Sequence, residues 1–206
     1  MSLILIQVKK MLTEYSTRDD IRKFRDKVFL KYEEMKDGWL GKEINRWMLL
    51  NRKKVGHYMV RSFKVDNQEV TLEIYPSVIQ STNRASKKLY SFALGTPVET
   101  RNGKIWYSFA KTNNEIHMYT PHYFKRHKER FMCDYLTDFN NTDIVPYTRN
   151  GRKYELWVCL DSVMVTRRVD DDFIYHITFL HKDQCTGKNY QNLFERIGNV
   201  IDECDI

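Results

Sequence analysis

Two-residue turns between alternating apolar and polar segments constrain the fold of this chain more than any other sequence feature. Asn102-Gly103 precedes the alternating segment Lys104–Ala110. Both central positions of a type I′ turn require a positive φ angle, which Asn and Gly adopt readily, so we expect a β-hairpin here. Tyr58–Val65 and Val70–Tyr75 flank Asp66-Asn67 and predict a second hairpin. The chain is therefore expected to form antiparallel sheet.

The second half of the chain predicts a three-stranded antiparallel meander. Polar turns separate its three segments, which are Tyr154–Leu160, Val163–Arg168 and Phe173–Leu180. Residues 136 to 153 instead contain Asp, Asn, Thr, Pro146 and Gly151 at a density typical of a loop. The 13 Tyr and 11 Phe residues favour extended structure, so a substantial sheet is expected. Pro76 is expected to end the second strand of the Asp66-Asn67 hairpin.

Apolar residues at helical spacing mark both ends of the chain. Thr17–Met35 predicts an amphipathic helix with Ser16 or Thr17 as its N-cap. The apolar positions of that helix are Ile21, Phe24, Val28, Tyr32 and Met35. Lys42–Lys54 predicts a second helix, and Lys188–Glu203 predicts a C-terminal helix. The buried face of the second helix is expected to contain Ile44, Trp47 and Met48.

These segments predict an α+β fold in a single domain that spans residues 1–206. Two N-terminal helices, a central basic helix over about 121–133 and a C-terminal helix would pack on a mostly antiparallel sheet. Residues 1–56 are expected to form a helical N-terminal subdomain, and residues 57–206 the α+β body. A chain of this length can bury a core without disulfides.

The composition limits the classes of function that fit this chain. A net charge of +7 favours a polyanion such as nucleic acid as a partner without identifying one. The four cysteines form no CxxC pair, which argues against a zinc knuckle or a thioredoxin-like site. No segment approaches the roughly 20 apolar residues of a membrane span, and Leu3–Val8 is too short for a signal-peptide core. We expect a cytoplasmic protein without a cofactor, a metal site or a membrane contact.

The stretch Thr120–Phe131 concentrates ionisable side chains at the start of the predicted central helix. Thr120 suits the N-cap, and Pro121 suits the first helical position because its missing N–H has no intrahelical partner there. Residues at four-residue spacing share one face of this helix, namely His122, Arg126 and Arg130. Lys125 and Lys128 add to the local positive charge, which would attract phosphate.

The order of these features is similar to that of a known family. A strand, a helix with the pattern His-x-x-x-Arg-x-x-x-Arg, and a meander whose last strand contains Ile177-Thr178-Phe179 resemble the barnase/RelE-like fold of small ribonucleases and toxins. The resemblance covers about Glu115–Lys182. It implies metal-independent, toxin-like cleavage of RNA by four catalytic residues, which are His122, Arg126, Arg130 and Thr178.

Metal-free RNA cleavage needs the residue types that this pattern supplies. The reaction needs a base for the 2′-hydroxyl proton, cations for the charge that develops at phosphate, and an acid for the leaving oxygen. His122 can serve as base or acid because the unperturbed pKa of histidine is about 6.5. Arg126 and Arg130 would hold phosphate through charge-assisted hydrogen bonds. Further nucleic-acid contacts are expected from Lys125, Lys128 and His176.

Three other interpretations remain open. The face with His122, Arg126 and Arg130 lies opposite the apolar face of its helix, so it is solvated surface if the apolar face packs on the sheet. A non-catalytic nucleic-acid-binding accessory protein would use the same cations only to hold phosphates. A protein-interaction module would carry them for solubility, with a partner that the sequence does not identify. Substrate identity and oligomeric state do not follow from the sequence.

Overall fold

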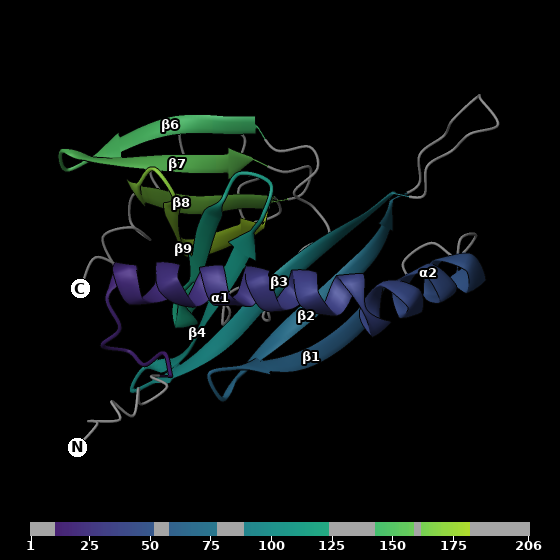
Figure 1. The fold of residues 1–206 in the computed structure, drawn as a ribbon. Helices are drawn as coiled ribbons and strands as arrows, with labels where there is room; N and C mark the ends of the chain where they lie inside the picture. The colour runs from purple at the N-terminus through teal and green to yellow at the C-terminus, as the bar shows by residue number, and fades with distance from the viewer. Residues whose placement is uncertain (1–10, 52–57, 78–88, 124–142, 159–161, 182–206) are drawn as a thin grey trace, which may run out of the picture. The chain divides into compact units, whose positions relative to one another are not determined.

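The chain forms two compact units, Met1–Val98 and Glu99–Ile206. The computed structural model describes residues 11–51, 58–77, 89–123, 143–158 and 162–181 (Figure 1). Both units build on β-sheet that is mostly antiparallel, so the predicted fold class is confirmed at that level. The prediction that the units form one domain stays a prediction.

Helix α1 (Arg18–Asp37) covers one face of the strands in the first unit. A capping box starts it: the Thr17 side chain accepts from the Asp20 N–H, and the Asp20 side chain accepts from the Thr17 N–H. All five predicted apolar positions are buried. Tyr32 stacks on Phe92 of the sheet, with ring centroids 4.7 Å apart. The predicted helix is therefore confirmed, with Thr17 as its cap.

Helix α2 (Trp39–Asn51) begins three residues before the predicted start. Its buried residues are Leu40, Ile44 and Met48, which lie four positions apart on one side of the helix. Trp47 was expected on the buried face but is only partly buried, because it lies off this row. Residues 52–54, the end of the predicted helix, lie outside the described residues. The sequence thus predicts the helix but misplaces its first turn.

In the described part of the first unit, three antiparallel strands follow the helices. They are β1 (Met59–Val65), β2 (Gln68–Ser77) and β3 (Leu89–Thr100), whose last two residues belong to the second unit. Asp66 and Asn67 have φ angles of 49° and 69°, which confirms the predicted turn between β1 and β2. Pro76 does not end β2, because it pairs with Tyr90 of β3. The described β1 pairs begin at Met59 and Ile74, so Pro76 lies beyond them and its missing N–H interrupts no described β1–β2 pair.

The described residues of the second unit form six strands in the spatial order β4, β5, β9, β8, β7, β6. They are β4 (Gly103–Ala110), β5 (Glu115–Tyr119), β6 (Asp143–Arg149), β7 (Arg152–Val158), β8 (Ser162–Asp170) and β9 (Phe173–His181). Strands β7 to β9 confirm the predicted antiparallel meander. The pair β5 and β9 is parallel, so the sheet is mixed. This parallel pair brings residues 116–119 beside residues 173–176.

Residues 143–149 form strand β6, although the sequence predicts a loop over 136–153. The strand pairs with β7 through a tight turn at Asn150 and Gly151, whose φ angles are 50° and 74°. Pro146 lies opposite Glu155 within β6. Proline is tolerated at this position because β6 is the edge strand of the described sheet, so its N–H groups are needed for pairing on one side only. The loop prediction is therefore wrong over this segment.

The β3–β4 turn lies one residue before its predicted position. The turn residues are Arg101 and Asn102, and Gly103 is already the first residue of β4. Gly103 has a φ angle of +117°, whereas Asn102 does not have a positive φ angle. A Cβ atom at Gly103 would also lie 3.3 Å from the Pro121 Cβ. Glycine is required here both by its backbone conformation and by the close approach of Pro121.

A helix begins at Pro121, as predicted, and its first three residues are described. The Thr120 Oγ1 accepts a 3.1 Å hydrogen bond from the Tyr123 N–H, which is the expected N-cap contact. The rest of the predicted central helix and the predicted C-terminal helix at 188–203 lie outside the described residues. Among the described residues, no helix has the length and apolar character needed to cross a membrane.

Candidate functional site

Side-chain alternation on four neighbouring strands gathers polar and aromatic residues on one face of the second unit. The parallel register sets His117 beside Ile174 and Tyr119 beside His176. Thr166 of β8 pairs with His176 of β9 on one side and with Glu155 of β7 on the other. These three residues therefore lie on the same face of the sheet. We call this surface the histidine face, and its members are Glu115, His117, Tyr119, Glu155, Trp157, Thr166, Arg168 and His176.

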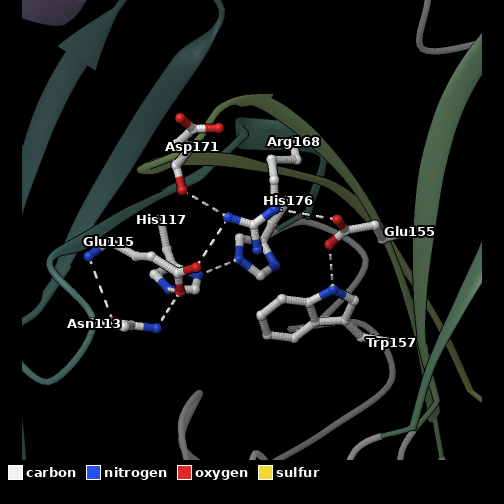
Figure 2. Close-up of polar contacts among 8 residues, drawn as sticks. All are labelled: Asn113, Glu115, His117, Glu155, Trp157, Arg168, Asp171 and His176. Atoms are coloured by element: carbon white, nitrogen blue, oxygen red, sulfur yellow. Dashed lines mark hydrogen bonds and ion pairs between the residues drawn. The ribbon is translucent and has the colours of Figure 1, made fainter.

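Two histidines are in direct contact on this face. His117 Nδ1 lies 2.9 Å from His176 Nε2, a hydrogen-bond distance (Figure 2). The other ring nitrogen of His117, Nε2, lies 3.4 Å from Glu115 Oε2. The His117 side chain is 12% exposed, whereas His176 is fully buried. A carboxylate, a partly accessible histidine and a buried histidine therefore form one chain of contacts.

Aromatic rings enclose the buried histidine. Tyr119 stacks on His176 with ring centroids 4.2 Å apart and an interplanar angle of 17°. The Trp157 ring is oriented edge-on to both histidine rings, with centroid distances of 5.8 Å to His117 and 5.5 Å to His176. The Tyr123 ring is nearly perpendicular to the His176 ring, and their centroids are 5.9 Å apart. This burial, and secondarily the neighbouring His117, lowers the pKa of His176 well below its ordinary value. His176 is therefore neutral at physiological pH.

The contact between the two rings allows a proton to be shared. With a neutral His176, one ring donates through its N–H and the other accepts through its lone pair. When His117 binds a second proton, both of its ring nitrogens donate, one toward Glu115 and one toward His176 Nε2. The positive charge then lies beside the Glu115 carboxylate. A protonated His117 would therefore have a partner for each of its two ring N–H groups.

Arg168 joins two carboxylates at the edge of the site. Its Nη1 donates to Glu115 Oε1 at 2.9 Å and its Nε to Glu155 Oε1 at 3.2 Å (Figure 2). Trp157 Nε1 donates to the other oxygen of Glu155 at 3.2 Å. Contacts with His117 first, and with Arg168 second, lower the pKa of Glu115. Glu115 is thus held ionised and oriented toward His117.

Thr120 fixes the start of the central helix to this face. Its backbone N–H donates to the His176 carbonyl at 3.2 Å, and its Oγ1 donates to the Ile177 carbonyl at 2.9 Å. The same Oγ1 accepts from the Tyr123 N–H. One threonine therefore both caps the helix and places the Tyr123 ring against His176.

No protein-family model, curated protein or solved structure matches this chain. The function of the histidine face is therefore inferred from its own chemistry.

The site residues predicted from the sequence do not all lie in the histidine face. His176 lies in the centre of the site. His122 is the second residue of the described helix start, is partly buried, and directly precedes Tyr123. The basic side chains predicted to bind phosphate lie outside the described residues, and they are Lys125, Arg126, Lys128 and Arg130. Their roles stay predictions.

A β-bulge separates Thr178 from His176. Val165 of β8 pairs with Thr178, whereas the next residue, Thr166, pairs with His176, so Ile177 has no partner of its own in this register. Residues two apart on a regular strand share a face, but this extra residue turns Thr178 to the opposite face. Thr178 is fully buried there, and its Oγ1 has no hydrogen-bond partner among the described residues. The structure does not bring Thr178 together with the histidine pair.

Sequence reasoning missed most of the site, which contains Glu115, His117, Glu155, Trp157 and Arg168 in addition to His176. One local signal was present: Glu115, His117 and Tyr119 alternate with apolar Ile116 and Met118, which predicts a polar face on this strand. Only the strand pairing brings Arg168 to a glutamate 53 residues away. The described residues contain no group of three side chains arranged to hold a metal ion.

Proposed function

We propose that this chain acts on nucleic acid as a metal-independent endoribonuclease, with His117 as the group that exchanges a proton with the substrate. The observation that carries the proposal is the contact chain from Glu115 through His117 to the buried His176. Carboxylate and histidine side chains arranged in this way are typical of general acid–base chemistry. The resemblance of Glu115–Lys182 to barnase/RelE-like ribonucleases implies the same class of reaction.

The geometry of His117 suggests how it acts. The 3.4 Å separation of His117 Nε2 and Glu115 Oε2 is longer than a normal N–H···O hydrogen bond, so a substrate hydroxyl can compete for Nε2. In the tautomer whose Nδ1–H donates to His176 Nε2, the unprotonated Nε2 of His117 would take the proton of a ribose 2′-hydroxyl while the oxygen attacks phosphorus. The leaving 5′-oxygen lies on the opposite side of phosphorus, so a second group, for which the sequence predicts His122, would supply its proton. The products would be a 2′,3′-cyclic phosphate and a free 5′-hydroxyl.

Glu115 and Arg168 have supporting roles in this proposal. Glu115 stabilises the imidazolium that forms when His117 takes the proton, because its carboxylate faces Nε2. Arg168 holds Glu115 in place from the other side. The cations that stabilise the developing charge at phosphate would be Arg126 and Arg130, as the sequence predicts.

The charge of the described network favours a second candidate, a nucleic-acid-binding protein that does not cleave. Glu115 and Glu155 share the single Arg168, so these three groups carry a net charge of −1 when His117 is neutral. Such a network does not itself attract phosphate. In this alternative the histidine pair only holds the sheet together, and basic surface elsewhere binds the polyanion.

Incubation with RNA separates the two candidates. The purified chain, His117→Ala and Arg126→Ala are each mixed with single-stranded RNA, with and without EDTA. Ribonuclease function predicts cyclic phosphate products that are insensitive to EDTA and are lost with His117→Ala. Glu69→Gln, an exposed carboxylate change in the first unit, is the matched control and should cleave normally. Intact RNA that is nevertheless retarded on a gel would replace the proposal with the binding protein.

A further inference from the structure

Helix α2 carries a stripe of four residues that does not belong to its buried face. Trp39, Glu43, Arg46 and Leu50 follow one another at intervals of four, three and four residues. At about 3.6 residues per turn, they lie within about 60° of one another around the helix axis. We call this stripe the α2 seam. The same spacing lines the contact between the paired helices of a coiled coil.

The two ends of the α2 seam are apolar and exposed. Trp39 is 56% exposed and Leu50 is 70% exposed. The helix packs on its own unit through a different row of side chains, which are Leu40, Ile44 and Met48. Figure 1 shows α2 directly after α1 in the first unit. The fold of that unit therefore leaves both ends of the seam in water, and contact with another molecule would bury them.

The middle of the α2 seam carries one base and one acid. Arg46 is exposed, and no described residue forms an ion pair with it. Glu43 is already bound by Arg61 of β1, whose Nε lies 3.1 Å from each carboxylate oxygen. This hydrogen bonding lowers the pKa of Glu43 and keeps the carboxylate ionised. The Glu43 side chain is still 32% exposed, and a carboxylate offers about four acceptor positions, so it can accept from a second arginine.

The α2 seam is complementary to itself in the reverse direction. Trp39 and Leu50 are equally distant from its midpoint, and so are Glu43 and Arg46. In an antiparallel pair of α2 helices related by a two-fold axis, Trp39 of each chain lies opposite Leu50 of the other. The same axis places Glu43 of each chain opposite Arg46 of the other, which forms two ion pairs. A parallel pair would instead set Arg46 against Arg46.

We propose that the α2 seam binds the α2 seam of a second copy of this chain, in an antiparallel and two-fold symmetric dimer. An anionic partner such as lipid or nucleic acid fits less well, because Glu43 lies in the middle of the seam. A helix of 13 residues forms a small interface, so the dissociation constant is expected in the micromolar range. The dimer is independent of the proposed function, because the seam lies in the first unit and the histidine face in the second.

Sedimentation equilibrium of the full chain tests the dimer. The concentrations run from micromolar to millimolar in a reducing buffer, because the chain contains four cysteines. Arg46→Glu sets like charges against each other twice per dimer and should raise the dissociation constant by at least about tenfold. Leu50→Ala removes two apolar contacts and should raise it by about tenfold. Two controls in α1 should dimerise like the unmutated chain: Lys23→Glu makes the same change in charge at an exposed position, and Leu30→Ala truncates a leucine that is 65% exposed.

A mixture of two charge variants tests the antiparallel register. Arg46→Glu chains alone and Glu43→Lys chains alone each bring like charges together across the two-fold axis. In the mixture the two altered positions face each other with opposite charges, so association should recover. Circular dichroism verifies that each variant is folded. An unmutated chain that stays monomeric at millimolar concentration would overturn the proposal, as would a dimer that Arg46→Glu weakens no more than Lys23→Glu does.

Discussion

The two units bury polar side chains in contrasting ways. In the first unit, Gln68 accepts from the Leu12 N–H at 2.7 Å and donates to Thr96 Oγ1 at 3.0 Å, and Thr96 Oγ1 donates to the Glu69 carbonyl at 2.7 Å. These groups are neutral at every ordinary pH. In the second unit the buried polar side chains include His176, which is in contact with another titratable side chain. Buried neutral networks rigidify a core, whereas buried titratable groups cost stability and mark candidate sites.

The largest expected difference between the Gln68–Thr96 network and the His117–His176 pair is their effect on the rate of RNA cleavage. His117→Ala should lower the single-turnover rate of RNA cleavage by about 10²- to 10⁴-fold, because it removes the proposed proton acceptor. Gln68→Ala should lower the free energy of unfolding and leave that rate unchanged, because Gln68 only supports the first unit. An unchanged rate in His117→Ala would break the distinction between the two networks.

The pH dependence of stability should also distinguish them. Burial, followed by the neighbouring His117, lowers the pKa of His176 in the folded protein, so the unfolded chain binds its proton at a higher pH. The free energy of unfolding should therefore fall as pH drops below about 6.5, by up to about 1.4 kcal/mol per pH unit. His176→Gln should remove this slope in urea denaturation between about pH 7 and pH 5.

Glu115 affects the free energy of unfolding at a lower pH than His176 does. Its pKa is lowered from 4.5 by His117 and then by Arg168, so the stability that it contributes is lost only as pH falls through values below 4.5. Parallel pH dependences for the unmutated chain and His176→Gln would show that His176 is not the group responsible.

A smaller effect is expected when the carboxylate loses its charge. Glu115→Gln keeps the size of the side chain but no longer stabilises a protonated His117, so the cleavage rate should fall by about tenfold, equivalent to about 1.4 kcal/mol. The KM for RNA should change little, because Glu115 is proposed to act through His117. Steady-state kinetics beside Glu69→Gln tests this point. An equal loss in both variants would assign the effect to net charge.

The smallest expected effect lies in the first unit. Thr17→Ala removes the side-chain half of the capping box of α1 and should lower the free energy of unfolding by about 1 kcal/mol. Urea denaturation measures this change, and cleavage should be unaffected because α1 carries none of the proposed site. A loss of cleavage at full stability would contradict the assignment of function to the second unit.

The sequence by itself determined the elements whose physical causes are local. The capping box at Thr17 and the apolar spacing of α1 act within a few residues, as do the positive φ angles of Asp66 and Asn67. The same holds for the start of the helix at Pro121. Strand β6 was missed because Pro146 and nearby turn formers oppose a strand locally, and edge pairing with β7 overrides that preference.

Only the tertiary structure decided the composition of the candidate site. The parallel pairing of β5 with β9 sets His117 against His176, 59 residues apart, and no local pattern encodes that register. The bulge at Ile177 then places Thr178 on the other face, although its position two residues after His176 predicts the same face. Helix caps and tight turns depend on neighbours in sequence, whereas the site depends on strand register, which the packing of the whole sheet selects.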